Sequence, residues 1–180
     1  VTTAQLRVLA HPTRLRLLRR LRTAGPGTAR ALGREFGLDS GAASYHLRRL
    51  AEGGLIAEDP HLGTRRERWW CAVADTVQFD PAEHSGDLSR EYVRSVLVAA
   101  ADDLQKVAAA VPSASSAWLE YAAVLDDRLR IDDATAGELR VELLALLARY
   151  RARSTTEADP DGPAQALAPT IVQVQLYQRP

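Results

Sequence analysis

The chain of 180 residues contains one cysteine, Cys71. A single cysteine excludes a disulfide framework within the chain, and it excludes any metal site built from several thiolates of one chain. Lysine is equally scarce, since Lys106 is the only lysine among 23 basic residues. This bias is typical of a GC-rich genome, so the use of arginine carries little information about what the protein binds.

Long apolar runs are also missing. No stretch of 18 apolar residues occurs, and the N-terminus lacks the basic-then-apolar layout of a signal peptide. We therefore expect a soluble, cytoplasmic protein. The length suggests one domain or two small ones, and a hydrophobic content of 46% is ordinary for a globular chain.

The residue sets of common enzyme classes are absent. The sequence has no Ser/His/Asp or Cys/His set, no phosphate-binding loop and no glycine-rich fingerprint. The histidines are scattered without i, i+4 pairing, at His11, His46, His61 and His84. Neighbouring carboxylates point apart on a helix or strand, so helix caps or solvated faces explain the pairs Asp102-Asp103, Asp126-Asp127 and Asp132-Asp133. We expect no enzyme activity, cofactor or metal.

The net charge of zero hides an asymmetry along the chain. Residues 1–70 hold 13 arginines against six acidic residues, a net +7, and residues 71–180 carry the compensating −7. A basic part beside an acidic part suggests that the first meets a polyanion. Ordinary solvated surface charge is the alternative.

The first part of the chain has a helical pattern in which residues typical of helix starts and ends mark the boundaries. Residues 3–10 form a short helix, and Pro12 is well placed at the first turn of a second helix that runs to a turn at 25–27. Thr28 caps the helix of residues 28–36, which Gly37 ends. The stretch GLDS then leads to another helix, residues 40–53, and the two make a helix-turn-helix.

The helix of residues 40–53 is amphipathic. Ser40 can act as its N-cap, and Gly53-Gly54 ends it. One side follows the i, i+4, i+7 spacing of a helix packed on a core, with Ala43, Leu47 and Leu50. The opposite side is small, polar or charged, with Gly41, Tyr45, Arg48, Arg49 and Glu52.

A strand pattern follows this helix. Residues 55–59 and 66–73 are β-prone and enclose a turn, so they predict a β-hairpin, or wing, directly after the helix-turn-helix. The tip of the wing carries Thr64, Arg65 and Arg66. Guanidinium groups at such a tip are suited to phosphates or to a minor groove, where the negative potential is high.

A loop over residues 74–86 leads to a long helix, residues 87–111. Its apolar residues repeat with spacings of four and three, at Val93, Leu97, Ala100, Leu104, Val107 and Val111. This seam is long enough to pair with the same helix of a second chain, and packing within the chain is the alternative.

The remaining part of the chain has its own pattern. Residues 115–124 predict a short helix, and residues 132–153 a longer one that is capped near Asp132 or Thr135. Residues 126–131 and 170–178 alternate like strands, and we expect them to pair. The intervening residues 154–169 are rich in proline, aspartate and alanine, which is typical of mobile segments.

These elements predict a mainly α fold of the α+β kind. We expect a winged helix-turn-helix domain in residues 1–76, a linker and dimerisation helix in 77–111, and a small α+β domain in 112–180. Aromatic residues of the last domain, Trp118, Tyr121 and Tyr150, are candidates to line an apolar ligand pocket, and the core of a small domain is the alternative.

The stretches LAHPTRLRLLRRL and SYHLRRLAEGGLIAED resemble the ArsR-type winged-helix transcription regulators. The family's opening motif is matched by Leu9, Pro12, Arg14, Leu17, Leu18 and Leu21. Its recognition-helix motif is matched by Ser44, His46, Leu47, Leu50, Gly54, Leu55 and Ile56, and its wing motif by Gly63 and Arg66. The match covers about residues 4–75, and several linked motifs in order are more specific than one. A vaguer second resemblance is to actinobacterial regulators with an added C-terminal domain.

The resemblance implies a homodimer whose interface uses the first helix, with Leu6, and the long helix, and it places helix 40–53 in the major groove of DNA. The first turns of such a helix approach base edges, so Ser40, Gly41, Ser44 and Tyr45 are the candidates for reading sequence. Arg48 and Arg49 lie further along, where phosphate contact is favoured. For His46, backbone or phosphate bonding and structural packing both stay open.

Many members of this family sense metals through a cysteine pair near the recognition helix or His/Asp ligands on the long helix. Neither set is present here, so metal sensing at those places is not expected. Cys71 is a candidate redox sensor, although its position after Trp69-Trp70 in a strand favours a buried, inert thiol.

The sequence therefore predicts a homodimeric, sequence-specific DNA-binding repressor or activator that recognises an imperfect palindrome, with a small-molecule effector as a further candidate partner. The alternative is a winged-helix module that binds another protein, against which the basic first part argues.

Overall fold

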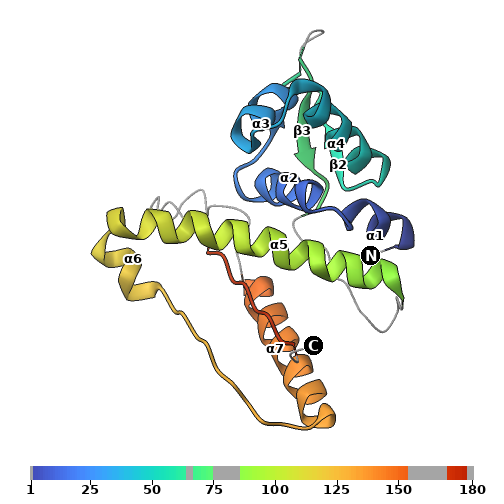
Figure 1. Cartoon of the computed structure of the whole chain (residues 1–180). Helices are drawn as coiled ribbons and strands as arrows, with labels where there is room; N and C mark the ends of the chain where they lie inside the picture. Colours follow the sequence, from blue (N-terminus) through green and yellow to red (C-terminus); the bar gives the residue numbers. More distant parts are fainter. Residues whose placement is uncertain (1, 64–66, 75–85, 154–169, 178–180) are drawn as a thin grey trace. The chain divides into compact units, whose positions relative to one another are not determined.

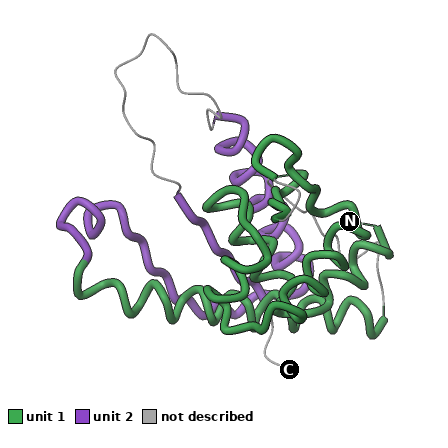
Figure 2. Tube along the Cα trace, turned by 90° about the horizontal axis from the view of Figure 1, so that it is seen from above, with its two compact units in different colours: residues 1–113 green, residues 114–180 purple. Residues whose placement is uncertain are grey.

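The computed structural model describes residues 2–63, 67–74, 86–153 and 170–177 (Figure 1). Contacts divide the chain into two compact units, which we call unit 1 (Val1–Ser113) and unit 2 (Ala114–Pro180) (Figure 2). No helix among the described residues is sufficiently long and apolar to span a bilayer.

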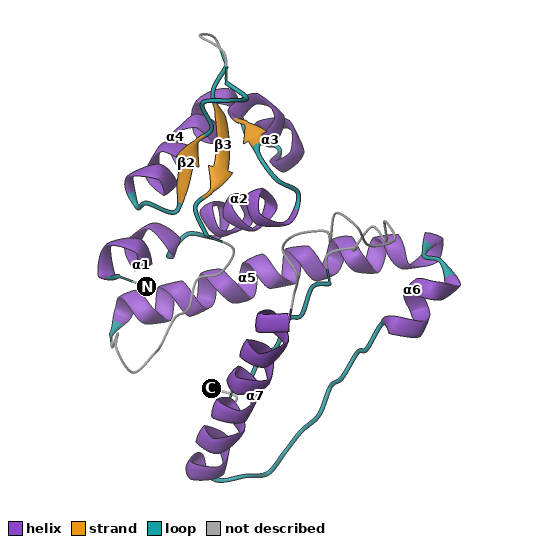
Figure 3. Cartoon of the chain, turned by 180° about the vertical axis from the view of Figure 1, so that it is seen from behind, coloured by secondary structure: helices purple, strands orange, loops and turns teal. Residues whose placement is uncertain are grey.

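The described residues of unit 1 form five α-helices and a small sheet (Figure 3). The helices are α1 (Thr3–Leu9), α2 (Pro12–Thr23), α3 (Ala29–Phe36), α4 (Ser40–Glu52) and α5 (Asp87–Ala110), which a 3₁₀ turn, η1 (Val111–Ser113), follows. The strands are β1 (Gly27–Thr28), β2 (Ile56–Glu58) and β3 (Trp69–Ala72). The mainly helical fold with a helix-turn-helix, a β-hairpin and a long helix is confirmed.

The sheet is antiparallel and has the order β1-β3-β2. Strands β2 and β3 form the predicted hairpin, in which Ala57 lies opposite Cys71. Strand β1 is not among the predicted elements, because the sequence pattern assigns Gly27 to a turn and Thr28 to a helix cap. Its residues pair with Trp70 and Trp69, and this pairing places the start of α3 against the hairpin.

Helix α2 lies at the centre of unit 1, where it packs against α1, α4, α5 and β3. The ring nitrogen Nδ1 of His11 caps the helix by accepting from the Thr13 N–H at 3.2 Å, and Pro12 begins it as predicted. Its apolar side chains join a single core that collects leucines from all sides, among them Leu6, Leu9, Leu15, Leu17, Leu18, Leu21, Leu32, Leu47 and Leu50.

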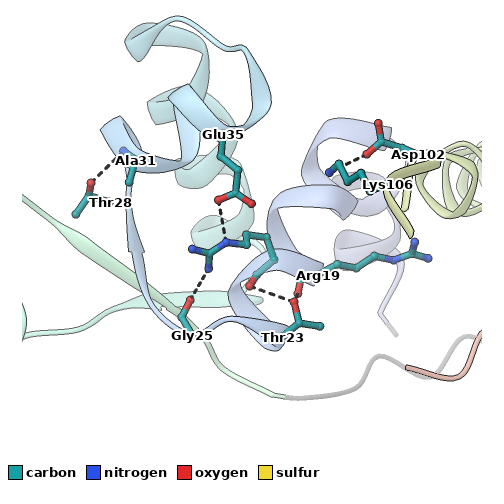
Figure 4. A network of polar contacts seen from close by, with 9 residues as sticks. Arg19, Thr23, Gly25, Thr28, Ala31, Glu35, Asp102 and Lys106 are labelled. Carbon is teal, nitrogen blue, oxygen red and sulfur yellow. Dashed lines mark hydrogen bonds and ion pairs between the residues drawn. The ribbon is translucent and has the colours of Figure 1, made fainter. Parts of the chain in front are cut away.

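Ion pairs tie α5 to α2 on the rim of this core. Arg16 Nε lies 3.0 Å from Asp102 Oδ2, and Arg19 Nη1 lies 2.9 Å from Asp103 Oδ2. Lys106 shares Asp102 at 3.1 Å (Figure 4). These carboxylates are about 30% exposed, so each pair contributes modestly, and the group acts mainly by fixing the register of the two helices.

Helix α3 is joined to the same group. The Phe36 ring has the guanidinium of Arg16 and the ammonium of Lys106 each 5.0 Å from its centroid. Arg20 Nε lies 2.9 Å from Glu35 Oε2 (Figure 4). Arginines of α2 therefore connect α3 with α5 through two neighbouring side chains of the last turn of α3.

Unit 2 differs from the prediction. It contains α6 (Ser116–Tyr121) and α7 (Asp133–Arg153), but residues 122–132 and 170–177 form no strand, so the expected pairing of 126–131 with 170–178 is wrong. Alternation predicts a strand only if a second strand and a core cover one face. None of the described residues of unit 2 is buried, so no core covers one face of these segments.

The predicted start of α7 is confirmed for one of the two candidate caps. Asp132 Oδ1 accepts a hydrogen bond from the Thr135 N–H at 2.8 Å, which satisfies a free donor of the first turn. This bond, together with one to the Thr135 side chain, lowers the pKa of the Asp132 carboxyl. The proline-rich segment 154–169 lies outside the described residues.

Gly33 allows α3 and α4 to pack closely. A Cβ at this position would lie 3.1 Å from the backbone oxygen of Leu38 and 3.4 Å from the Ala43 Cβ. We predict that Gly33→Ala destabilises unit 1 by about 1–3 kcal/mol, because a backbone atom cannot give way as a flexible side chain can. Chemical denaturation followed by circular dichroism and tryptophan fluorescence measures the change.

Gly137→Ala is the matched control, since nothing lies within 4 Å of the new methyl group in α7. It should stabilise its helix by up to about 1 kcal/mol through helix propensity. Equal effects of the two substitutions would contradict the close approach at Gly33.

Candidate nucleic-acid interface

The N-cap of helix α4 lies one residue earlier than the sequence predicts. Asp39, and not Ser40, is the N-cap, because Asp39 Oδ1 accepts from the Ala42 N–H at 2.8 Å. Ser40 is thus the first helical residue, and its exposed hydroxyl is not occupied by capping. Gly41 also contributes to the cap, since a Cβ there would lie 3.2 Å from Asp39 Oδ1.

The inward side of α4 is the predicted one. Ala43, Leu47 and Leu50 are completely buried between α2, α3 and β2. This burial fixes the rotation of α4 about its axis, and therefore fixes which residues lie outside. The outward side comprises the exposed Ser40, Gly41, Tyr45, Arg48, Arg49 and Glu52, with Ser44 and His46 half-buried at its edges.

The outward side carries one aromatic and two cationic groups. The Tyr45 side chain is 51% exposed. Arg48 Nε donates to the Ser44 carbonyl oxygen at 3.3 Å, and no carboxylate of the described chain pairs with it. Arg49 is paired with Glu52 one turn along the same helix. Arg48 therefore offers the less compensated charge of the two.

His46 packs against His11 at the junction of α4 and α2. The two ring centroids are 4.8 Å apart, and the Tyr45 ring is edge-on to His46 with a centroid separation of 5.5 Å. His46 Nδ1 is buried without a hydrogen-bond partner among the described residues. Of the two predicted roles, the structure shows the packing contact.

Both rings are disfavoured as cations. Burial is the main cause that lowers the pKa of His11, and the Arg14 guanidinium adds to it. Burial also lowers the pKa of His46, followed by repulsion from His11 and Arg14. His11 must in any case keep Nδ1 unprotonated to cap α2.

Arg14 has a structural position. Its Nε donates to the carbonyl oxygen of Val8, and an Nη donates to that of Arg7 at 3.3 Å. These carbonyls belong to the last turn of α1, where helical partners are missing. The arginine of the opening motif thus holds α1 against the start of α2.

Several other arginines of the basic part are also used within the fold. Arg16, Arg19 and Arg20 are in ion pairs, and Arg22 Nε donates to the Ala74 carbonyl oxygen at 2.8 Å. The net +7 of residues 1–70 is therefore not all directed at a partner.

Two exposed arginines on α3 were not singled out from the sequence. Arg30 and Arg34 lie one turn apart on α3, and neither forms an ion pair with the described residues. Their i, i+4 spacing on the first helix of a helix-turn-helix, the helix that crosses the DNA backbone, was the available signal.

The wing is described only in part. Thr64, Arg65 and Arg66 lie outside the described residues, so their role in DNA contact stays a prediction. On the hairpin, Arg68 Nε lies 3.8 Å from Glu58 Oε2. Cys71, in the central strand β3, is half-buried rather than buried, with Sγ 3.6 Å from the Ala57 carbonyl oxygen.

The predicted dimer residues fall into two groups. Leu6 and Ala100 are 1% and 3% exposed and belong to the core of their own chain. The others lie on the surface of α5, on a side about 130° around the helix from the buried residues Tyr92, Ser95 and Ala99. We call this side the α5 seam; it consists of Val93, Leu97, Leu104, Val107 and Val111, all exposed.

The predicted pocket residues are on the surface of unit 2. Trp118, Tyr121 and Tyr150 are 43%, 87% and 57% exposed. Tyr150 is instead flanked by the guanidinium groups of Arg149 and Arg153, at 5.7 Å and 5.4 Å from its centroid. The residues that the structure describes contain no group of three or more His, Cys, Asp or Glu placed to hold a metal ion.

Residues 9–59 match the family model of a helix-turn-helix domain. The matched range runs from the end of α1 through β2 and so includes both helices of the motif and the junction with α2. No curated protein is significantly similar to the chain. The match indicates a DNA-binding regulator and leaves the ArsR assignment as a resemblance.

Acid should weaken unit 1 through the histidine pair. The folded pKa values of His11 and His46 lie below their ordinary value of 6.5, so the unfolded chain binds more protons once the pH falls below that value. Stability is therefore complete above about pH 7 and declines as the pH drops through 6.5 towards the folded values. Urea unfolding at pH 7.5 and 5.5 measures this.

His11→Asn provides the comparison, since asparagine keeps an N-cap oxygen but does not titrate. We expect a smaller loss of stability between the two pH values in this variant. The same loss in both proteins would show that other groups cause it.

Proposed function

We propose that the protein is a transcription regulator that binds DNA sequence-specifically as a homodimer, with α4 in the major groove. The observation that carries this proposal is the outward side of α4. It has small residues in its first turn and arginines further along, and the buried opposite side fixes its orientation. A helix of this kind is positioned by the fold and free to meet a groove.

The exposed residues divide by position into base and phosphate contacts. Ser40, Gly41, Ser44 and Tyr45 belong to the first turns of α4, which approach base edges. Arg48 and Arg49 lie nearer its end and are assigned to phosphates, as are Arg65 and Arg66 of the wing. Because few long side chains stand near the bases, DNA shape and water contribute to recognition.

Arg30 and Arg34 extend the phosphate-binding surface. In a helix-turn-helix the first helix crosses the sugar-phosphate backbone, and α3 is that helix here. They form no ion pair with the residues that the structure describes, whereas Arg16, Arg19 and Arg20 of α2 are paired within unit 1. We assign α2 to support and α3 and α4 to DNA.

We further propose that the α5 seam pairs with its counterpart in a second chain. Its five aliphatic side chains repeat with coiled-coil spacing and are 39–52% exposed, although the opposite side of α5 is packed on α1 and α2. A two-fold dimer would present two α4 helices roughly 34–36 Å apart, which matches half-sites one turn of DNA apart.

Binding to the DNA upstream of the protein's own gene tests the proposed function. Fluorescence anisotropy with that fragment and with random duplex, each at two salt concentrations, should show clearly tighter binding to the first. Equal, weak and steeply salt-dependent binding to both would leave only a basic surface, and the alternative of a protein-binding module would then take its place.

Two substitutions on α4 should have different effects. Tyr45→Ala is expected to cost about 1–3 kcal/mol on the specific site and little on random DNA, because it removes a contact near the bases. Arg48→Ala should weaken both duplexes and reduce the salt slope by about one unit. Arg128→Ala, an exposed arginine of unit 2, is the control and should change neither. An equal loss on both duplexes for Tyr45→Ala would reassign this residue to the backbone.

A charge in the α5 seam should weaken the association of the chains. Leu104→Asp places a carboxylate among the five apolar residues and should raise the dissociation constant of the dimer in analytical ultracentrifugation, with weaker DNA binding. Val98→Asp is the matched control, because Val98 is 46% exposed on another side of α5. Monomers in the unsubstituted protein, or an unchanged dissociation constant in Leu104→Asp, would remove the seam from the proposal.

A further inference from the structure

Helix α7 has an apolar side with no partner among the residues of unit 2 that the structure describes. Val141, Leu144, Ala145 and Ala148 follow the i, i+3, i+4, i+7 spacing of a packed helix side, but Val141 and Leu144 are 61% and 54% exposed. The opposite side, with Leu139, Leu143 and Leu147, is partly covered. A helix with apolar residues on two sides is normally buried on both.

Four charged residues of α7 lie along one edge of this apolar side, and Arg140 and Arg151 lie along the other edge. Glu138 and Glu142 lie one turn apart in the first half of the helix, and Arg149 and Arg153 lie one turn apart in the second half. Like charges at i, i+4 destabilise an isolated helix. All four residues are exposed, and none of them forms an ion pair with another described residue.

The helix dipole explains this pattern only in part. Acidic residues near the N-terminus and basic residues near the C-terminus interact favourably with the dipole, but the effect fades beyond the first and last turns. Glu142 is the tenth of the 21 residues of α7 and lies outside that range. A partner with the opposite order of charges would account for both pairs.

The spacing matches a second copy of α7 in the antiparallel direction. Glu138 and Arg153 are each 7.5 residues from the midpoint between positions 145 and 146, and Glu142 and Arg149 are each 3.5 residues from it. A two-fold axis at this midpoint therefore places Glu138 opposite Arg153 of the other copy and Glu142 opposite Arg149. The apolar side is centred between Leu144 and Ala145, within one residue of the same point.

We propose that α7 pairs antiparallel with α7 of a second copy of this chain, through Val141, Leu144, Ala145 and Ala148, with Glu138–Arg153 and Glu142–Arg149 ion pairs across the contact. An isologous contact of this kind doubles every ion pair by symmetry. The arginines now stack on Tyr150, so the exposed side chains need only rotate to reach the partner. The contact does not depend on DNA binding or on the α5 seam.

Cysteine cross-linking in the full chain tests the direction of pairing. In a Cys71→Ser background, Ala145→Cys lies half a residue from the axis, so the two sulfurs should oxidise to a disulfide. Ala134→Cys is the matched control on the same side of the helix. Its counterpart would lie roughly 34 Å away along the axis in the antiparallel pair, and it should not cross-link.

The result expected is a disulfide dimer for Ala145→Cys at least about tenfold more abundant than for Ala134→Cys. Efficient cross-linking at both positions would indicate parallel pairing or collision, and cross-linking at neither would indicate no pairing; either result overturns the proposal. Retaining the disulfide when Leu104→Asp is added would separate this contact from the α5 seam.

Charge exchange tests the ion pairs. A chain with Glu138→Arg and Glu142→Arg, and a second chain with Arg149→Glu and Arg153→Glu, should each lose the Ala145→Cys disulfide but form it with each other when mixed. Circular dichroism checks that both chains keep their helices. Undiminished cross-linking of either chain alone, or no recovery in the mixture of folded chains, would contradict the assigned register.

Discussion

The proposed DNA-binding surface depends on the burial of one side of α4. Ala43, Leu47 and Leu50 are inaccessible to solvent because α2, α3 and β2 close over them. Each buried leucine contributes about 1.5–3 kcal/mol relative to an exposed one, so rotating the helix by even 100° would be very costly. Tyr45 and Arg48 point outward as a direct consequence, and a surface that reads DNA needs this fixed orientation.

The same constraint explains how the arginines are divided. Helix α2 packs against both α4 and α5. Three of its arginines form ion pairs with Asp102, Asp103 and Glu35. Charges on α3 and on the outward side of α4 have fewer partners. The charge of residues 1–70 is thus split between ion pairs that hold the scaffold and cations that remain for a polyanion, which composition alone does not reveal.

Local patterns predicted most of unit 1, since caps, glycine stops and helical spacing are properties of neighbouring residues. The inward side of α4 and the start of α2 follow from them. Strand β1, the contact of His11 with His46, and the closeness allowed by Gly33 were missed, because each depends on residues distant in sequence. The failed strands of unit 2 have the same cause: alternation describes the need for a partner and does not supply one. The exposed apolar residues of α5 and α7 likewise indicate that these helices require a packing partner.

The central claim is that two copies of α4 read a two-fold symmetric DNA sequence. Selection of duplexes from a random pool by the full-length protein, followed by sequencing, tests this claim most directly. We expect an enriched imperfect palindrome whose half-sites are about one helical turn apart. Selected duplexes as diverse as the starting pool, or a single unrepeated half-site, would contradict it.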